Sequence, residues 1–179
     1  MLAAMLAVSI PAGSEESAAE KAGPGLGQPA SDELVQHWNI SVFPDGRCLP
    51  EGSGSVAQGE KIYNEQCITC HARAGAGGSG DRLARAEMGL TEEFPQKTIA
   101  NYWPYATTLF DFIRRSMPMH NPGSLSDDET YALTAYLLSL DNVIPEDAVM
   151  NQDTLPNVTM PNRDGFIDVW QDDPMNTAR

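Results

Sequence analysis

Cys67-Ile68-Thr69-Cys70-His71 is the stretch of sequence that decides the fold of this chain. Two thiols separated by two residues can form thioether bonds with the two vinyl groups of one porphyrin, and the histidine after the second thiol can bind the iron. The run therefore predicts one covalently attached haem c. Cys67 and Cys70 are the expected attachment points, and His71 is the expected axial ligand on one face of the iron.

Zinc binding and thiol redox chemistry are the alternatives for two cysteines at this spacing. A zinc site needs four ligands, and the other candidates, Cys48, His37 and His120, are scattered along the chain. A thioredoxin-like motif is expected beside a βαβ pattern, which the sequence lacks. Haem attachment is therefore the favoured interpretation. Cys48 is left over as a free thiol, as one half of an intermolecular disulfide, or as a small apolar side chain.

Length and charge limit the class of protein. The chain has 179 residues, which is room for one ordinary domain with extensions. Its 25 acidic and 11 basic residues give a net charge of −14, so nucleic acid and anionic membranes are poor partners. Such a surface could attract a basic patch on a redox partner. Solubility, or adaptation to a salty environment, would explain the charge equally well.

The first residues look like a segment for export. Residues 1–14 resemble the remnant of a signal peptide, because an apolar run is followed by small residues, although the usual basic start is missing. The run is too short to cross a bilayer, so we expect a periplasmic protein with no membrane span. Residues 15–33 are rich in Ala, Gly, Pro, Ser and Glu and predict a flexible leader.

Residues 55–142 predict an all-α haem domain. A helix is expected over residues 55–66, where Val56, Gly59 and Tyr63 share one face and the glycine would let another helix approach closely. The glycine-rich run that follows the haem motif is expected to be flexible and to pass around a planar ligand.

Two further helices are expected in the same domain. The first covers residues 108–116 and is ended by Met117-Pro118. The second begins at a capping box formed by Ser126 and Glu129. It carries an apolar stripe, which predicts an amphipathic helix, made of Ala132, Leu133, Tyr136, Leu137 and Leu140.

Long extensions flank this domain. Residues 34–54 have near-alternating apolar positions before a turn, and we expect them to fold against the haem domain or a partner subunit. Residues 143–179 are rich in Pro, Asn and Asp without periodicity, and they predict an irregular segment on the surface. Neither extension is needed to surround a haem, so both are candidate docking arms.

Met117 is the best candidate for the second axial ligand. It precedes a proline in a loop between two helices, where a thioether can point inward, and thioether ligation raises the reduction potential relative to two imidazoles. Met119 and His120 remain competitors, and a methionine can also serve only as core packing.

Other residues are candidates for contacts with the porphyrin. Arg114, Arg115, Tyr102 and Trp103 could donate hydrogen bonds to the propionates, although the two aromatic residues could equally pack in the core. The pocket wall is expected to include Leu83, Leu90, Phe94 and Phe110.

Taken together, Gly59, the haem motif, Met117-Pro118 and the capped last helix resemble the class I cytochrome c fold, in which three or more helices surround a covalently bound haem. In that fold a proline carbonyl commonly orients the ligand histidine. Here no proline lies between His71 and Phe94, so the group that holds Nδ1 of His71 is not identified from the sequence.

A narrower similarity extends over longer stretches, among them Phe43-Pro44-Asp45-Gly46, Lys97-Thr98-Ile99-Ala100-Asn101-Tyr102-Trp103-Pro104 and Met160-Pro161-Asn162-Arg163-Asp164-Gly165-Phe166. These stretches resemble the cytochrome c subunit (SoxD) of the Sox sulfur dehydrogenase. The resemblance implies a periplasmic electron-transfer subunit paired with a molybdenum cofactor subunit (SoxC-like), which oxidises persulfide sulfur held on a sulfur-carrier protein. The electrons would pass to a soluble cytochrome c, and this chain would contribute no catalytic residue. Cys48 stands where a small residue such as glycine is expected.

Two other functions stay open. The chain could be a diffusible monohaem carrier, or the cytochrome subunit of another periplasmic dehydrogenase such as one for sulfite. A haem enzyme or gas sensor would require that neither Met117 nor Met119 bind the iron, which would leave an open sixth position.

Overall fold

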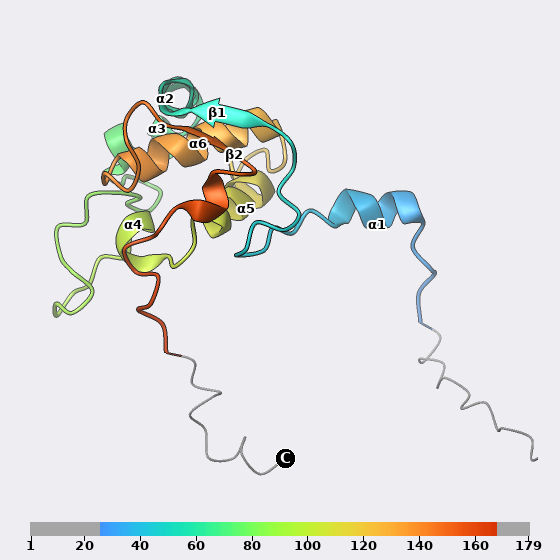
Figure 1. The fold of residues 1–179 in the computed structure, drawn as a ribbon, viewed down its shortest axis with the longest axis horizontal. Helices are drawn as coiled ribbons and strands as arrows, with labels where there is room; N and C mark the ends of the chain where they lie inside the picture. Colours follow the sequence, from blue (N-terminus) through green and yellow to red (C-terminus); the bar gives the residue numbers. More distant parts are fainter. Residues whose placement is uncertain (1–25, 168–179) are drawn as a thin grey trace, which may run out of the picture.

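A computed structural model describes residues 26–167, and these residues form one helical body with a projecting N-terminal arm (Figure 1). The predicted signal remnant and most of the predicted leader lie outside the described residues, as do residues 168–179. The α-helices are α1 (Asp32–Trp38), α2 (Val56–Gln66), α3 (Ile68–His71), α4 (Ile99–Tyr102), α5 (Ala106–Ser116) and α6 (Asp127–Ser139). Two short strands, β1 (Ser53–Ser55) and β2 (Val149–Asn151), and two 3-10 turns, η1 (Arg73–Gly75) and η2 (Leu155–Asn157), complete the order. The predicted all-α class is confirmed, with one small β ribbon added.

Helix α2 begins where the sequence predicts and crosses α6 closely. The Ser55 side chain accepts a hydrogen bond from the N–H of Gln58, and Oε1 of Gln58 accepts one from the N–H of Ser55, so the first turn is capped in both directions. The buried residues of α2 are Val56, Gly59 and Tyr63. A Cβ on Gly59 would overlap the carbonyl of Ala132 on α6, so the predicted close approach of a second helix is confirmed.

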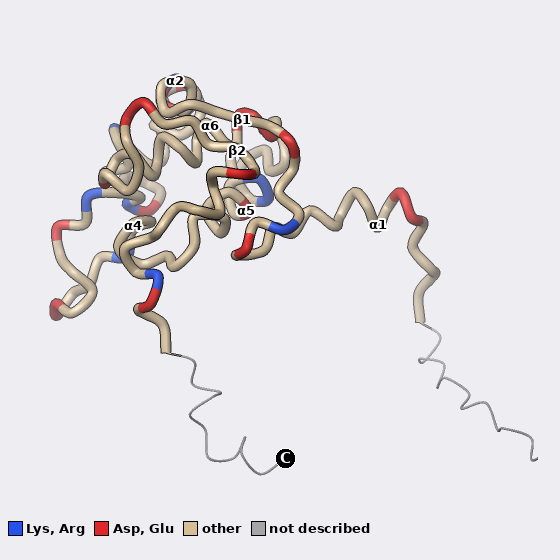
Figure 2. The backbone as a smooth tube through the Cα atoms, in the orientation of Figure 1, with Lys and Arg blue, Asp and Glu red and all other residues tan. Residues whose placement is uncertain are grey.

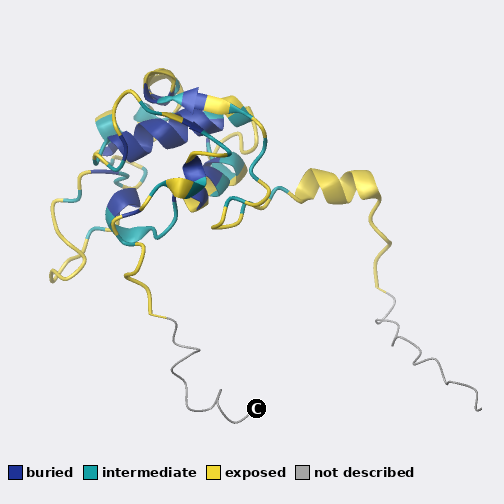
Figure 3. Ribbon diagram, in the orientation of Figure 1, coloured by how far each residue is buried: buried dark blue, intermediate teal, exposed yellow. Residues whose placement is uncertain are grey.

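Helix α6 is the centre of the body rather than an amphipathic surface helix. Its first turn is capped by Ser126 and Glu129, as the sequence predicts. Every residue from 130 to 139 is buried, whereas the predicted stripe covered one face only (Figure 3). The prediction of an amphipathic helix is wrong because α2, α5 and the β ribbon all pack against α6.

The β ribbon joins the two extensions across the top of α6. Strands β1 and β2 pair antiparallel, with Gly54 opposite Met150. A Cβ on Gly54 would overlap the backbone of Ala132, so only glycine lets the ribbon lie directly on the helix.

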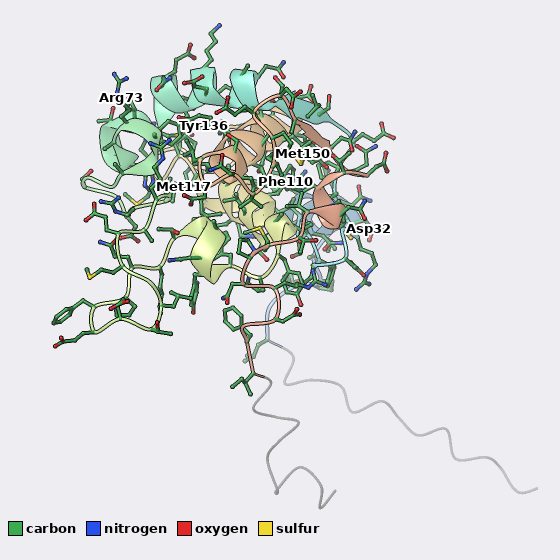
Figure 4. The ribbon with its side chains drawn as sticks, turned by 60° about the vertical axis from the view of Figure 1, so that its left-hand side comes forward. Asp32, Arg73, Phe110, Met117, Tyr136 and Met150 are labelled. Atoms are coloured by element: carbon green, nitrogen blue, oxygen red, sulfur yellow. The ribbon has the colours of Figure 1, made fainter. Side chains whose placement is uncertain are left out.

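The segment after residue 143 is part of the core and does not only cover the surface. Its side chains at Ile144, Met150, Leu155 and Met160 are buried in the same cluster as the helices. Phe110, Tyr136 and Met150 lie in the middle of the body (Figure 4). Residues 143–160 are therefore more regular and more firmly packed than their composition predicts.

Helix α5 holds the segment that follows α1. The Asp111 carboxylate accepts a hydrogen bond from the N–H of Val42 (2.9 Å) and pairs with Arg115 (2.9 Å). The hydroxyl of Thr107 donates to the carbonyl of Pro44 (3.3 Å). These polar contacts fix residues 42–44 against α5.

Helix α1 stands apart from the body (Figure 1). Ser31 caps it, and none of its residues is buried. This helix, which exposes Leu34, Val35 and Trp38, was not predicted from the sequence, and the alternating apolar positions described there begin at Trp38 and continue after α1. Over residues 26–167, none of the helices combines the length and the apolar character that crossing a membrane requires.

Candidate haem site

The haem motif forms one helical turn directly after α2. Helix α2 ends at Gln66, and the carbonyl of its cap residue, Cys67, accepts hydrogen bonds from the N–H groups of Cys70 (3.2 Å) and His71 (3.0 Å). Residues separated by three and four positions share one face of a helix, so Cys67, Cys70 and His71 are presented together. Cys67 is half-buried, Cys70 is exposed, and both are free thiols. Burial, together with the neighbouring Cys70, raises the pKa of the Cys67 thiol to about 11.

A backbone carbonyl holds the ligand histidine. Nδ1 of His71 lies 2.8 Å from the carbonyl oxygen of Asp81. A carbonyl can only accept a hydrogen bond, so Nδ1 carries the proton and Nε2 is left with its lone pair for a metal. The sequence offers no proline for this purpose, and Asp81 fills the role through its main chain.

The loop that brings Asp81 to the histidine is ordered, not flexible as the sequence predicts. The N–H of Gly77 donates to the carbonyl of His71 (2.9 Å), and the N–H of Gly80 donates to the carbonyl of Cys70 (2.8 Å). A Cβ on Gly80 would lie 2.8 Å from Cε1 and 3.0 Å from Nδ1 of the imidazole. Glycine is therefore needed at residue 80 so that the loop can lie against the His71 ring.

Of the three candidates for the opposite ligand, only Met117 is turned toward the protein interior. It is the C-terminal cap residue of α5, with its N–H bonded to the carbonyl of Ile113 (3.0 Å), and it packs partly buried against the core. Met119 is 79% exposed and His120 is also exposed. This arrangement favours Met117 as the axial thioether.

The two arginines expected to bind propionates have partners within the chain. Arg114 pairs with Asp127 at the start of α6 (3.1 Å), and Arg115 pairs with Asp111 one helical turn before it (2.9 Å). A guanidinium group carries five N–H donors, so these ion pairs leave donors over, and the propionate assignments of Arg114 and Arg115 stay predictions.

Tyr102 and Trp103 remain candidates for propionate contacts. Both are half-buried at the end of α4. The Lys97 ammonium lies 4.7 Å from the centre of the Tyr102 ring, and Trp103 packs edge-on against Phe112 with ring centres 5.7 Å apart. The lysine adds a positive charge beside Tyr102, which the sequence interpretation did not include.

The expected pocket wall is only partly assembled. Phe110 is fully buried and Leu83 packs against the core cluster. Phe94 is 68% exposed and Leu90 is 37% exposed, because both lie in the long loop between η1 and α4. The prediction that these two residues line a pocket is therefore not supported by their positions.

Cys48 is exposed in a left-handed backbone conformation (φ 66°). A glycine adopts this conformation without steric cost, in agreement with the expectation of a small residue there.

The donor set as folded fits haem c. Two free thiols and one imidazole share a helical face, the imidazole has its proton fixed on Nδ1, and a thioether at the end of α5 packs on the same core. Cys67 and Cys70 would hold the group, with His71 and Met117 on its two faces.

Sequence reasoning missed two groups at this site. The carbonyl of Asp81 belongs to the main chain, so no residue-type signal could point to it. The hydroxyl of Tyr63 donates to the carbonyl of Ala72 (2.7 Å), directly after the ligand histidine. Its helical spacing to Cys67 was visible in the sequence, but it indicated only a packing face.

Comparisons with known proteins agree with this site. Residues 56–141 match the family model described as cytochrome c. A thiosulfate dehydrogenase from Stutzerimonas stutzeri (strain A1501) is 31% identical over 62% of this chain, and the chain spans 41% of the length of that relative. A solved chain of the sulfane dehydrogenase SoxCD from Paracoccus pantotrophus is 37% identical, with a TM-score of 0.76, and the match covers 87% of this chain and 78% of that chain.

Proposed function

Because this chain belongs to the cytochrome c family and binds haem c covalently, we propose that it is the electron-transfer subunit of a periplasmic sulfur dehydrogenase complex. Its donor would be a molybdenum cofactor subunit that oxidises persulfide sulfur bound to a carrier protein. Its acceptor would be a soluble cytochrome c. The bond-making chemistry would belong to the molybdenum subunit, and this chain would transfer single electrons.

One observation carries the proposal: the similarity to the SoxCD chain reaches beyond the haem domain. That match covers 87% of this chain at 37% identity, whereas the cytochrome c family model covers residues 56–141 only. A cytochrome that shared only the haem domain would have no reason to resemble the extensions as well. The extensions are the parts that a free carrier does not need.

The residues of the chain support electron transfer without substrate binding. When bound, haem iron supplies a one-electron couple between the ferric and ferrous states. His71, polarised by its hydrogen bond to Asp81, would occupy one axial position, and the soft sulfur of Met117 would occupy the other. With both positions filled, no site remains on the metal for a sulfur substrate.

Helix α1 supports the docking role of the N-terminal extension. It has seven residues, none of them buried, and it exposes Leu34 (49%), Val35 (51%) and Trp38 (71%). Trp38 lies four positions after Leu34 and three after Val35, so its side chain neighbours both on one side of the helix. An isolated helix of this length is not stable in water, and burying its apolar face against a partner subunit would stabilise it.

Charge supports an acceptor with a basic surface. The net charge is −14, and acidic positions occur on α1 and around the whole body (Figure 2). Attraction between opposite charges raises the association rate and is screened by salt. Transfer to a basic soluble cytochrome should therefore slow as the salt concentration rises.

The test joins association and electron transfer. The haem-loaded chain is produced together with the molybdenum subunit of the same organism. The purified complex is then mixed with a carrier protein loaded with persulfide. We expect reduction of the haem with the complex and none with the isolated chain. Equal reduction of the isolated chain, or no association between the two proteins, would contradict the proposal.

A matched pair of variants tests the docking face. Trp38→Ala removes an exposed aromatic side chain from α1, and Phe94→Ala removes one of similar exposure (68%) from the loop before α4. We expect Trp38→Ala to weaken co-purification with the molybdenum subunit and Phe94→Ala to leave it unchanged. The same effect from both variants would remove α1 from the interface.

The similarity to a thiosulfate dehydrogenase supports a second candidate, in which the electrons come from thiosulfate. The same purified complex separates the two, because thiosulfate alone should reduce the haem under the second function and fail under the first. A chain that remains monomeric with every dehydrogenase offered would instead be a diffusible carrier.

A further inference from the structure

Tyr63 carries a buried hydroxyl with two partners beside the haem motif. It lies on α2, four residues before Cys67, and its side chain is fully buried. Its ring packs against Tyr136 of α6 with the centres 5.1 Å apart. The hydroxyl donates to the carbonyl of Ala72 (2.7 Å) and accepts from the N–H of Gly75 (3.1 Å). Packing alone would require the ring but not the hydroxyl.

The segment that this hydroxyl holds has an unfavourable backbone. Ala72 has φ 56° and ψ −178°, Ala74 has φ 51°, and Gly75 has φ 70°. The conformation of Ala72 is one that residues with a Cβ rarely adopt. Such a conformation persists only where neighbouring groups fix it. The two hydrogen bonds of Tyr63 attach to both ends of this strained turn.

The turn is connected to the partner of the ligand histidine. The carbonyl of Gly75 accepts from the N–H groups of Leu83 (2.8 Å) and Ala84 (3.3 Å). These two residues follow Asp81, whose carbonyl lies 2.8 Å from Nδ1 of His71. Hydrogen bonds therefore link Tyr63 to Gly75 and Gly75 to residues 83 and 84, and the backbone continues from there to Asp81, whose carbonyl contacts the imidazole.

We infer that Tyr63 is a positioning residue for the axial histidine: its hydroxyl fixes the 72–75 turn so that the Asp81 carbonyl stays in hydrogen-bond contact with His71. A hydrogen bond from Nδ1 makes the imidazole a stronger donor to the metal and favours the ferric state. Loss of the Tyr63 hydroxyl should weaken that bond and raise the reduction potential. The inference needs covalent haem attachment only, so it does not depend on the identity of the electron donor.

The test compares two tyrosines that lose the same group. Tyr63→Phe removes the hydroxyl beside the haem motif. Tyr131→Phe removes an equally buried hydroxyl on α6, which donates to the carbonyl of Pro50 (2.9 Å) far from the 72–84 loop in sequence. Both variants should lose some stability, so stability alone cannot separate positioning from ordinary packing.

Three readouts on the full-length, haem-loaded protein separate the two roles. They are the midpoint potential, the solvent exchange of the His71 Nδ1 proton followed by NMR, and the amide exchange of Gly75 and Leu83. We expect Tyr63→Phe to raise the potential and to speed both kinds of exchange, with Tyr131→Phe matching the parent protein in all three. If Tyr63→Phe matched the parent protein in potential and Nδ1 exchange, or if Tyr131→Phe changed them equally, the inference would be overturned.

A second variant covers the case in which Tyr63→Phe does not retain haem. Ala72→Gly removes the Cβ that makes the turn unfavourable, so Tyr63→Phe combined with Ala72→Gly should recover haem retention. If the double variant also failed while Tyr131→Phe succeeded, the hydroxyl would be needed for something other than holding the turn, and the inference would be wrong.

Discussion

Replacing Gly59 by alanine tests the helix crossing on which the haem motif depends. Gly59 lies in the middle of α2, one helical turn before Tyr63 and two before Cys67. A Cβ at this position would overlap the carbonyl of Ala132 and would lie 2.7 Å from the Cβ of Tyr136, both on α6. Carbon atoms in contact prefer about 3.5–4.0 Å, so the two helices would have to separate by about 1 Å.

Two opposing effects set the size of the change. Alanine is a better helix former than glycine by about 1 kcal/mol. Overpacking a well-filled interface costs about 1–3 kcal/mol, and here the overlapped atom is a backbone carbonyl in a helix that is buried on all sides, so we expect the upper end. The net loss in free energy of unfolding is then about 2 kcal/mol. For a chain of this size that corresponds to a fall in Tm of about 4–8 °C.

The assay is reversible thermal unfolding of the haem-loaded protein followed by circular dichroism. Gly89→Ala is the matched control, because a Cβ there would meet nothing within 4 Å and the residue does not have a left-handed backbone. We expect Gly89→Ala to be neutral or slightly stabilising. If Gly59→Ala were as stable as the parent protein, the steric cost would be no larger than the gain in helix propensity, and the close crossing of α2 and α6 would be refuted.

Three further predictions concern other parts of the molecule. Cys48→Gly should raise the free energy of unfolding by about 1 kcal/mol, because the left-handed backbone at residue 48 (φ 66°) costs a residue with a Cβ about that much, whereas Cys48→Val should lower it. Urea unfolding of both variants measures the difference, and equal stability would contradict backbone strain at residue 48. Burial raises the pKa of Tyr63 and of Tyr131 to about 12, above the ordinary value near 10, so these tyrosines ionise first in the unfolded chain. Their contribution to stability should be constant below pH 10 and fall from there through pH 12, with a slope of at most about 1.4 kcal/mol per pH unit for each tyrosine. A profile that Tyr131→Phe leaves equally steep between pH 10 and pH 12 would contradict this. Asp111→Asn removes the charge that pairs with Arg115 and weakens the acceptor for the N–H of Val42, so amide exchange at Val42 should speed up while the reduction potential stays unchanged. The control Asp153→Asn, elsewhere on the surface, should leave amide exchange at Val42 as it is. Unchanged exchange at Val42 in Asp111→Asn would mean that α5 does not hold residues 42–44.

Local signals in the sequence were sufficient for the starts of α2 and α6 and for the haem motif, whereas α5 begins at Ala106, two residues before the predicted start, and α1 and α4 were not predicted. Ser55 with Gln58 and Ser126 with Glu129 each form a cap from residues three positions apart, so the information lies within one turn. The contact between Gly59 and α6 could also be anticipated, because a glycine on an apolar helix face has few other purposes.

Features that depend on distant segments could not be predicted in the same way. Helix α6 is buried all round because α2, α5 and the β ribbon all pack against it, and nothing in its own apolar stripe indicates that β2 returns from beyond it to do so. The partner of Arg114 is set by the tertiary arrangement, which places Asp127 within reach, whereas Asp111 and Arg115 are four positions apart on α5 and their pairing is a local signal. The acceptor for His71 is a main-chain carbonyl, which residue types do not reveal.

The ferric near-infrared spectrum tests the central claim most directly, because that claim is a haem c closed by His71 and Met117 and therefore built for electron transfer. The account predicts the absorption band of methionine sulfur on ferric haem in the parent protein, its retention in Met119→Ala, and its loss in Met117→Ala. Absence of the band in the parent protein, together with ready binding of carbon monoxide to the ferrous form, would contradict the account and indicate an open iron site.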